Sequence, residues 1–192
     1  IMTEDDLDWI EESGKFTNVS IEETLPYPDG TTGFYFIRLE YVSNIKEILE
    51  EERQTRQALL TDKVTWQGET VLVSYPTLDI NEIQQAFDGD PLTLIRTLEA
   101  NPLRLVIEFQ EPKRLNGVKV RIGGTPTNIT IRAFLDEKQS GVKETRVDRS
   151  TEIRDIQLQF DQALSADSLE ITIFNPHDGE IAHVHLWEVS YE

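Results

Sequence analysis

The stretch NITIRAFLDEKQSGVKETRVDRSTEIRDIQLQF, residues 128–160, contains two strand-length runs in which apolar and polar residues alternate. In the first run Ile129, Ile131 and Ala133 are separated by polar residues, and the second run ends in the same pattern at 156–160. Successive side chains of a β-strand point to opposite faces, so each run has one face on a core and the other in solvent. The segment therefore predicts antiparallel strands joined by turns.

Runs of the same kind recur on both sides of this segment, from about residue 62 to the C-terminus. They occupy 70–75, 103–110, 115–124, 143–148, 168–175 and 182–191. Turn residues separate them and almost no helical pattern intervenes, whereas a parallel sheet would need crossover helices. We therefore predict a mainly β fold, an antiparallel β-sandwich or jelly roll that spans residues 62–192.

Residues 1–61 differ from the rest and predict a small α+β appendage. We expect a short acidic helix over 4–13, an aromatic and β-branched strand over 34–42, and a helix over 45–60 that begins after Asn44. So short a segment cannot bury its apolar side chains by itself. The prediction is that the appendage packs onto the sandwich.

The composition limits the classes of partner and chemistry. There are 36 acidic and 18 basic residues, a net charge of −18, and no sustained basic stripe, so nucleic acid and anionic membrane surfaces are poor partners. The absence of cysteine excludes disulfides, thiolate metal sites and a cysteine nucleophile. No apolar run is long enough to span a membrane. The chain opens with Ile1-Met2, which is not a natural start, so we interpret it as a piece of a larger protein.

The motif AFDGDPLT, residues 86–93, places four turn-forming residues in a row, from Asp88 to Pro91. Two carboxylates and the Thr93 hydroxyl within six residues also form an oxygen-rich loop of the kind that hard cations such as calcium prefer. The alternative is a hydrogen-bonded turn with no ion. Residue composition alone leaves both interpretations open.

Three pieces in order carry a resemblance to a known fold family. They are INEIQQAFDGDPLT (80–93), NPLRLVIEFQEPKRLNGVKVRIGG (101–124) and VHLWEVSYE (184–192). This arrangement resembles the galactose-binding-like fold of coagulation-factor C-type (discoidin) domains and related carbohydrate-binding modules, over about two-thirds of the chain. Ile95 stands where the family often has a tryptophan.

The resemblance implies a structural calcium site and a glycan-binding end. Calcium would be held by Asp88, Asp90, Thr93 and Glu188, with a main-chain carbonyl near Ala86. Sugar-binding members use an exposed aromatic residue and polar loop residues at one end of the sandwich. The candidates of these types are Trp66, Arg96, Asn101, Asn175, His177 and Asp178. Trp66 has a competing interpretation as a half-buried residue that covers an edge of the sandwich.

One further pair of residues has the spacing of metal ligands. His183 and His185 are two apart on an expected strand, so both rings face the same side, as in some zinc or copper sites. With no third ligand evident nearby, a structural pair is the favoured interpretation.

Three functional hypotheses stay open. The first is a non-catalytic accessory module, glycan-binding, from a larger extracytoplasmic (periplasmic or cell-surface) or membrane-anchored protein. The second is a structural or protein-interaction domain without sugar affinity, in which 34–42 and its helix form a docking appendage. The third is an enzyme acting on glycans, although the chain has no G-x-S-x-G or H-E-x-x-H motif, and the abundance of carboxylates says nothing about their pairing.

Overall fold

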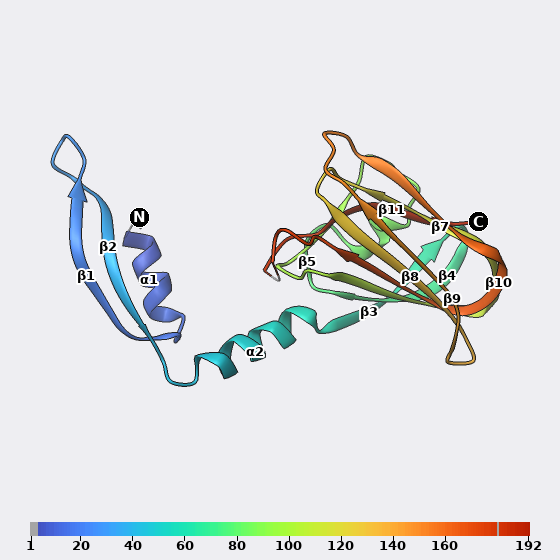
Figure 1. The fold of residues 1–192 in the computed structure, drawn as a ribbon, viewed down its shortest axis with the longest axis horizontal. Coiled ribbons are helices and arrows are strands. Elements are labelled where there is room, and N and C mark those ends of the chain that lie inside the picture. Colours follow the sequence, from blue (N-terminus) through green and yellow to red (C-terminus); the bar gives the residue numbers. More distant parts are fainter. Residues whose placement is uncertain (1–3, 180) are drawn as a thin grey trace. The chain divides into compact units, whose positions relative to one another are not determined.

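The computed structural model describes residues 4–179 and 181–192 (Figure 1). The chain divides into two compact units, Ile1–Gln54 and Thr55–Glu192. None of the described helices is long and apolar enough to cross a membrane.

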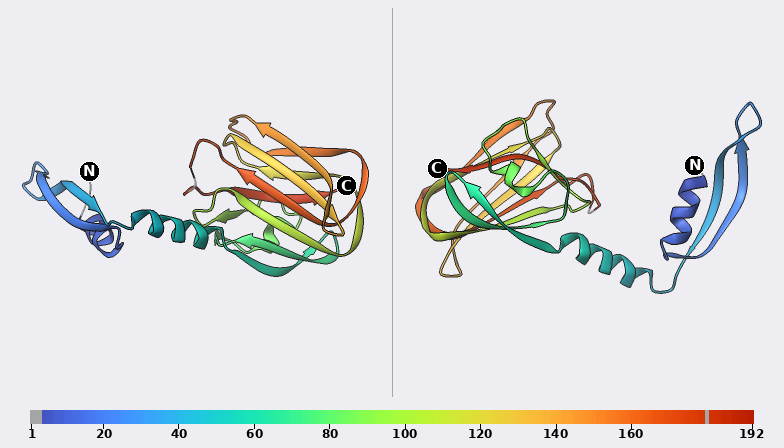
Figure 2. Two further views of the ribbon diagram at one scale, coloured as in Figure 1. Left: turned by 60° about the horizontal axis from the view of Figure 1, so that its bottom comes forward. Right: turned by 180° about the vertical axis from the view of Figure 1, so that it is seen from behind.

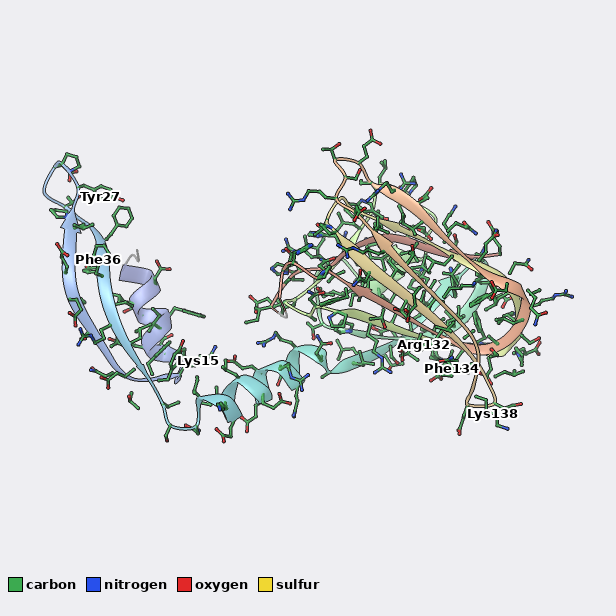
Figure 3. The ribbon with its side chains drawn as sticks, in the orientation of Figure 1. Lys15, Tyr27, Phe36, Arg132, Phe134 and Lys138 are labelled. Carbon is green, nitrogen blue, oxygen red and sulfur yellow. The ribbon has the colours of Figure 1, made fainter. Side chains whose placement is uncertain are left out.

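The first unit consists of the helix α1 (Glu4–Glu12) and an antiparallel hairpin of β1 (Phe16–Pro26) and β2 (Thr32–Tyr41). The strand β1 was not predicted, because its glutamates and terminal proline do not alternate with apolar residues as a half-buried strand would. Of the large apolar side chains described in this unit, only Ile10 is fully buried. Tyr27 and Phe36 stay 48% and 46% exposed (Figure 3).

The helix α2 (Ile45–Gln57) is shorter than the predicted helix over 45–60. The next strand, β3, already begins at Leu59 and pairs with β4 (Glu69–Pro76) along its whole length. Pairing therefore decides the backbone conformation of the Leu59-Leu60 step against its good helix propensity. None of the described side chains of α2 is buried.

The second unit is entirely antiparallel and mainly β, as predicted. Beyond β3 and β4 its elements are β5 (Leu78–Ile80), the 3₁₀ helix η1 (Ile83–Ala86), β6 (Ile95–Thr97), β7 (Leu103–Ile122), β8 (Thr127–Leu135), β9 (Lys138–Val147), β10 (Arg154–Phe174) and β11 (His185–Tyr191). The hydrogen-bonded order is β5-β6-β11-β7-β10-β8-β9, and β4 lies between β3 and β7. Figure 2 shows the strands of this unit from two further sides.

Two long strands, β7 and β10, connect the two layers of the sandwich. The first half of β7 pairs with β4 and with the last part of β10, while its second half pairs with β11 and the first part of β10. The register between β7 and β10 breaks around residues 159–168, where the strands pass from one layer to the other. Each of them was predicted as two shorter runs, because the residues at the bend interrupt the alternation.

The core lies between the layers and follows the alternation seen in the sequence. Ile129, Ile131 and Ala133 of β8 are buried, and β10 opposes them with buried side chains at 169, 171 and 173. The pattern that predicts the strands therefore also places their inner faces.

A β-bulge in β11 changes which side chains of this strand reach the surface. Leu186 pairs with Ile122 and Glu188 pairs with Arg121, so Trp187 is the extra residue. Leu186 and Val189 are buried, and the two residues between them are both partly exposed. The bulge thus presents Trp187 and Glu188 side by side on the outer face, where a regular strand would present only one of them.

Candidate functional site

Trp187 lines a pocket of about 280 Å³ on the outer face of the sandwich. Its ring approaches Gly123 so closely that a Cβ atom there would lie 3.0 Å from Trp187 Cζ3. At Gly124 a Cβ atom would collide with the carbonyl oxygen of Ser150. Gly123 therefore allows the ring to lie against backbone, and Gly124 allows the strand end to lie against the backbone of Ser150. We call this the Trp187 pocket; its lining is Leu94, Ile122, Gly123, Gly124, Thr125, Thr127, Asn175, His185 and Trp187.

His185 provides the polar edge of the Trp187 pocket. Its ring centroid lies 6.2 Å from that of Trp187. Burial lowers the pKa of His185, and the positive charge of Arg96 acts in the same direction, so the imidazole is neutral at pH 7. A neutral imidazole offers one hydrogen-bond donor and one acceptor, which is the pairing that a sugar hydroxyl can use.

Two of the predicted ligand residues, Asn101 and Asn175, hold this end of the sandwich together. The side-chain Nδ2 of Asn101 donates to the backbone carbonyl oxygens of Asn175 (2.9 Å) and Gly179 (2.6 Å). Its side-chain Oδ1 accepts from the backbone N–H of Asn175 (2.9 Å). Asn101 is only 1% exposed. Asn101 is thus a structural residue that fastens the turn after β10, although Asn175 also lines the Trp187 pocket.

The remaining loop candidates do not form one constellation. Arg96 Nε donates to Asp79 Oδ1 at 2.9 Å, so its guanidinium is occupied by a carboxylate of the neighbouring edge strand β5. His177 and Asp178 are exposed on the turn after β10.

The two histidines that had metal-ligand spacing have other partners. His183 Nδ1 lies 2.7 Å from the Thr97 carbonyl oxygen, and His185 faces Trp187. The described residues contain no group of three or more histidine, cysteine, aspartate or glutamate side chains that could hold a metal ion.

Trp66 is a core residue rather than an exposed platform. It is 1% exposed, and its indole N–H donates to the Val189 carbonyl oxygen at 2.8 Å. Its ring stacks on Phe109 and meets Phe87 and Tyr191 edge to face. A sugar cannot stack on a ring that is fully buried. Trp66 is therefore not a ligand-binding residue.

The loop of residues 86–93, called the Asp88 loop below, gathers oxygen atoms around the Thr93 hydroxyl. Thr93 Oγ1 lies 3.0 Å from the Asp90 carbonyl oxygen and 3.3 Å from that of Gln85. The two carboxylate oxygens of Asp88 are 3.3 and 3.4 Å from the same hydroxyl. One hydroxyl carries one proton and can donate to only one of these four acceptors. The loop is therefore rich in oxygen atoms, although Asp88 Oδ1 is already paired and accepts from the Asp90 amide at 2.8 Å, as in a hydrogen-bonded turn.

Glu188 reaches the Asp88 loop from the final strand, 99 positions away in the sequence. Its Oε2 accepts a hydrogen bond from the Gly89 amide at 3.1 Å. The carboxylate of Asp90 instead accepts from the Leu92 amide at 2.9 Å, so Asp90 offers its carbonyl oxygen to the cluster. The structure thus brings two carboxylates together with hydroxyl and main-chain oxygens, rather than three carboxylates.

Solved structures with the same arrangement of strands are carbohydrate-binding modules and related domains. A family 32 carbohydrate-binding module of Clostridium perfringens, in complex with galactose, is 17% identical over 63% of this chain and 92% of that chain, with a TM-score of 0.51. The C-terminal domain of a chitobiase from Bacteroides fragilis is 11% identical over 68% of this chain and 97% of that chain, with a TM-score of 0.50. The second unit has the galactose-binding-like fold. No protein-family model matches the chain, and no curated protein matches it.

Sequence reasoning missed Trp187, the partly exposed tryptophan of this galactose-binding-like domain. A signal was present in VHLWEVSYE. Leu186 and Val189 are both apolar but lie three positions apart, whereas residues on one face of a regular strand lie two or four positions apart. A bulge resolves the conflict, but its position depends on the register with β7, which the residues of β11 alone do not specify.

Glu188 should make the stability of the second unit depend on pH. Burial raises the pKa of Glu188 to about 7, and the charges of Asp88 and Asp90 add to the rise. Between the ordinary value of 4.5 and about 7 the unfolded chain ionises first, so ionisation costs the folded state stability as pH rises. The side chain is partly exposed, so solvent screening reduces the effect. We expect the free energy of unfolding to fall by about 1–2 kcal/mol across this pH range.

The variant Glu188→Gln removes this titration. We expect the stability of Glu188→Gln relative to the parent to rise by about 1–2 kcal/mol as pH increases from 4.5 to 7. Urea unfolding in the presence of a calcium chelator measures both proteins. Glu152→Gln, at an exposed carboxylate far from the Asp88 loop, is the control and should show no such trend. A constant difference between Glu188→Gln and the parent across this range would contradict the assignment.

Proposed function

We propose that the second unit is a non-catalytic glycan-binding module and that the sugar binds in the Trp187 pocket. The observation that carries this proposal is a partly exposed tryptophan whose ring lies against Gly123, in a pocket that His185 also lines. An aromatic face packs on the C–H face of a sugar ring, and a few polar groups orient its hydroxyls. The galactose-binding-like fold of known carbohydrate-binding modules supports the proposal at the level of the fold.

The lining of the Trp187 pocket also favours binding over catalysis. Glycoside hydrolysis requires two carboxyl groups that flank the scissile bond. No aspartate or glutamate occurs among the described residues that line this pocket. The volume of about 280 Å³ suits one sugar ring rather than an extended chain.

A glycan array followed by calorimetry with D-galactose tests the proposal. Trp187→Ala should reduce the affinity for galactose, or for the best ligand on the array, at least tenfold, because the stacking surface is lost. Trp9→Ala is the matched control, since Trp9 is 66% exposed in the first unit and lies outside the pocket. Equal affinities of Trp187→Ala and the parent, or no bound glycan on the array, would contradict the proposal.

Calcium is proposed as a structural ion in the Asp88 loop. The oxygen atoms suit a hard cation, because the Asp88 carboxylate, the Thr93 hydroxyl and the carbonyl oxygens of two further residues lie close together, and Glu188 adds a second carboxylate. A cation would supply the positive charge that the acceptors lack. It would also fasten the loop to the final strand.

A second candidate is a protein-interaction role for the first unit. Its described residues leave the aromatic side chains of Trp9, Tyr27 and Phe36 between 46% and 66% exposed, so they are available for contact with a partner. The two roles are compatible in one larger extracytoplasmic or membrane-anchored protein, where glycans are accessible. Secretion of the full-length parent protein, followed by cell-surface labelling, tests that location.

A further inference from the structure

The sheet of the first unit has two open edges. Among the described residues, β1 and β2 pair only with each other. A two-stranded hairpin is at best marginally stable in water, and the backbone N–H and C=O groups along an open edge are a template for a further strand. The hairpin is therefore able to accept a third strand from a partner.

The edge of β2 is more regular than the edge of β1. The pairing register makes Thr17 and Glu22 extra residues in β1, and this strand ends at Pro26. Bulges and prolines interrupt the row of backbone groups with which a new strand pairs. From Phe34 to Tyr41, β2 contains neither. The strand with a continuous open edge is thus β2.

One face of the hairpin carries a cluster of apolar side chains near the turn. Leu25 is paired with Phe34, and Phe36 follows Phe34 on the same face of β2. The Tyr27 ring meets the Phe34 ring edge to face, with centroids 5.5 Å apart, and lies against Gly33, where a Cβ atom would be 3.3 Å from Tyr27 Cδ2. All four side chains stay partly exposed (Figure 3). We call Leu25, Tyr27, Phe34 and Phe36 the Phe36 patch.

The helix α1 lies on the opposite face of the hairpin. Ile37 and Leu39 of that face are partly buried, and Ile10 of α1 is fully buried. Six of the nine residues of α1 are acidic. The two faces of the hairpin therefore differ, because one presents apolar side chains and the other carries an acidic helix.

The charge of the first unit favours a basic partner. Residues 1–54 contain 14 acidic and 4 basic residues, a net charge of −10. The rest of the chain has a net charge of −8, so a second copy of the chain would be repelled. A segment that carries lysine or arginine would instead be attracted.

We infer that the open edge of β2 binds an extended segment of a partner protein in which apolar and basic residues alternate. This inference rests on the protein-interaction role proposed for the first unit. Successive side chains of the added strand point to opposite faces, so its apolar side chains cover the Phe36 patch and its basic side chains point to the side on which α1 lies. Main-chain hydrogen bonds supply affinity, and the charge selects the segment.

The sandwich also has an open edge, but its charge is opposite. The edge strand β9 pairs with β8 alone and carries three basic residues and one acidic residue. Lysine and arginine on an edge strand oppose the addition of a basic strand. The same chain thus contains a second edge on which the inference can be compared.

The probe is a capped peptide of alternating lysine and valine, as long as the segment from Phe34 to Tyr41. Calorimetry on the full chain should show binding, and the largest changes in amide NMR shifts should lie on β2. Phe36→Ser should weaken the binding about tenfold or more, because apolar contact is lost. Val142→Ser is the matched control, since Val142 is 44% exposed on β9, and it should bind as the parent does. The NMR spectra verify that both variants are folded.

Two further peptides test the mode of binding without any change to the protein, so they decide the question even if Phe36→Ser does not fold. A version that is N-methylated at every residue has no backbone N–H to donate, and we expect it not to bind. A version with glutamate in place of lysine should not bind either, because the first unit repels it.

The outcomes separate this inference from the other proposals. No binding of the lysine–valine peptide, equal binding of its N-methylated version, or shift changes confined to the second unit would overturn it. Binding of the glutamate version at β2 would also overturn it, but would leave a protein-interaction role for the first unit. Self-association of the chain through β2, detected by sedimentation, would replace the basic segment with a second copy. Galactose binding in the Trp187 pocket is measured separately and depends on none of these results.

Discussion

Replacing Trp66 with alanine should lower the free energy of unfolding of the second unit by about 3–5 kcal/mol. The indole is fully enclosed, with ring centroids 5.3 Å from Phe87, 5.8 Å from Phe109 and 4.7 Å from Tyr191. Its removal leaves a cavity between residues from four separate segments, which cannot all collapse inward. The Val189 carbonyl oxygen also loses its donor.

Urea unfolding followed by circular dichroism measures this loss. Trp66→Phe keeps an aromatic ring in place but removes the indole N–H and part of the ring volume, so we expect an intermediate cost of about 1–3 kcal/mol. Trp9→Ala, at a tryptophan that is 66% exposed, should change the stability of the second unit by less than about 0.5 kcal/mol. A loss below about 1 kcal/mol in Trp66→Ala would show that Trp66 is not a core residue.

Calcium should stabilise the second unit by about 2.7 kcal/mol when its free concentration is a hundred times the dissociation constant. The ion binds only the folded state, in which the Asp88 loop and Glu188 are in contact. In the unfolded chain they are 99 positions apart in the sequence and do not form one site. Asp88→Asn should remove most of this gain, since it removes the charge of the carboxylate that lies beside the Thr93 hydroxyl. In the parent, bound calcium should also abolish the pH dependence that Glu188 causes.

Thermal melts in calcium and in chelator provide the measurement. Asp29→Asn is the matched control, because Asp29 accepts from the backbone and hydroxyl of Thr31 in a turn of the first unit. It should leave the calcium response intact. Identical midpoints of the parent in calcium and in chelator would remove the ion and leave a hydrogen-bonded turn.

The sequence was sufficient for the fold of the second unit because its information is local and periodic. Ile129, Ile131 and Ala133 alternate with polar residues, and all three are buried. Short turn segments separate the strands. A parallel sheet would instead need crossover helices between them, so the sequence favours antiparallel pairing. Sequence information was weaker for the first unit, where the strand β1 (Phe16–Pro26) has no alternation and forms through its pairing with β2.

The ends of elements also depended on pairing. The Leu59-Leu60 step has good helix propensity, but it is part of β3 because β4 lies beside it. Propensity is worth a fraction of a kilocalorie per residue, so the hydrogen bonds and contacts of a neighbouring strand override it.

The sequence by itself determined the antiparallel sandwich, the acidic character of the chain and the oxygen-rich Asp88 loop. Only the tertiary structure decided which tryptophan is covered and which is available. Trp66 and Trp187 both follow strand-like patterns, yet the first is enclosed by three aromatic rings and the second is turned outward by a bulge. Burial depends on what packs on a side chain from distant segments, and no local pattern contains that information.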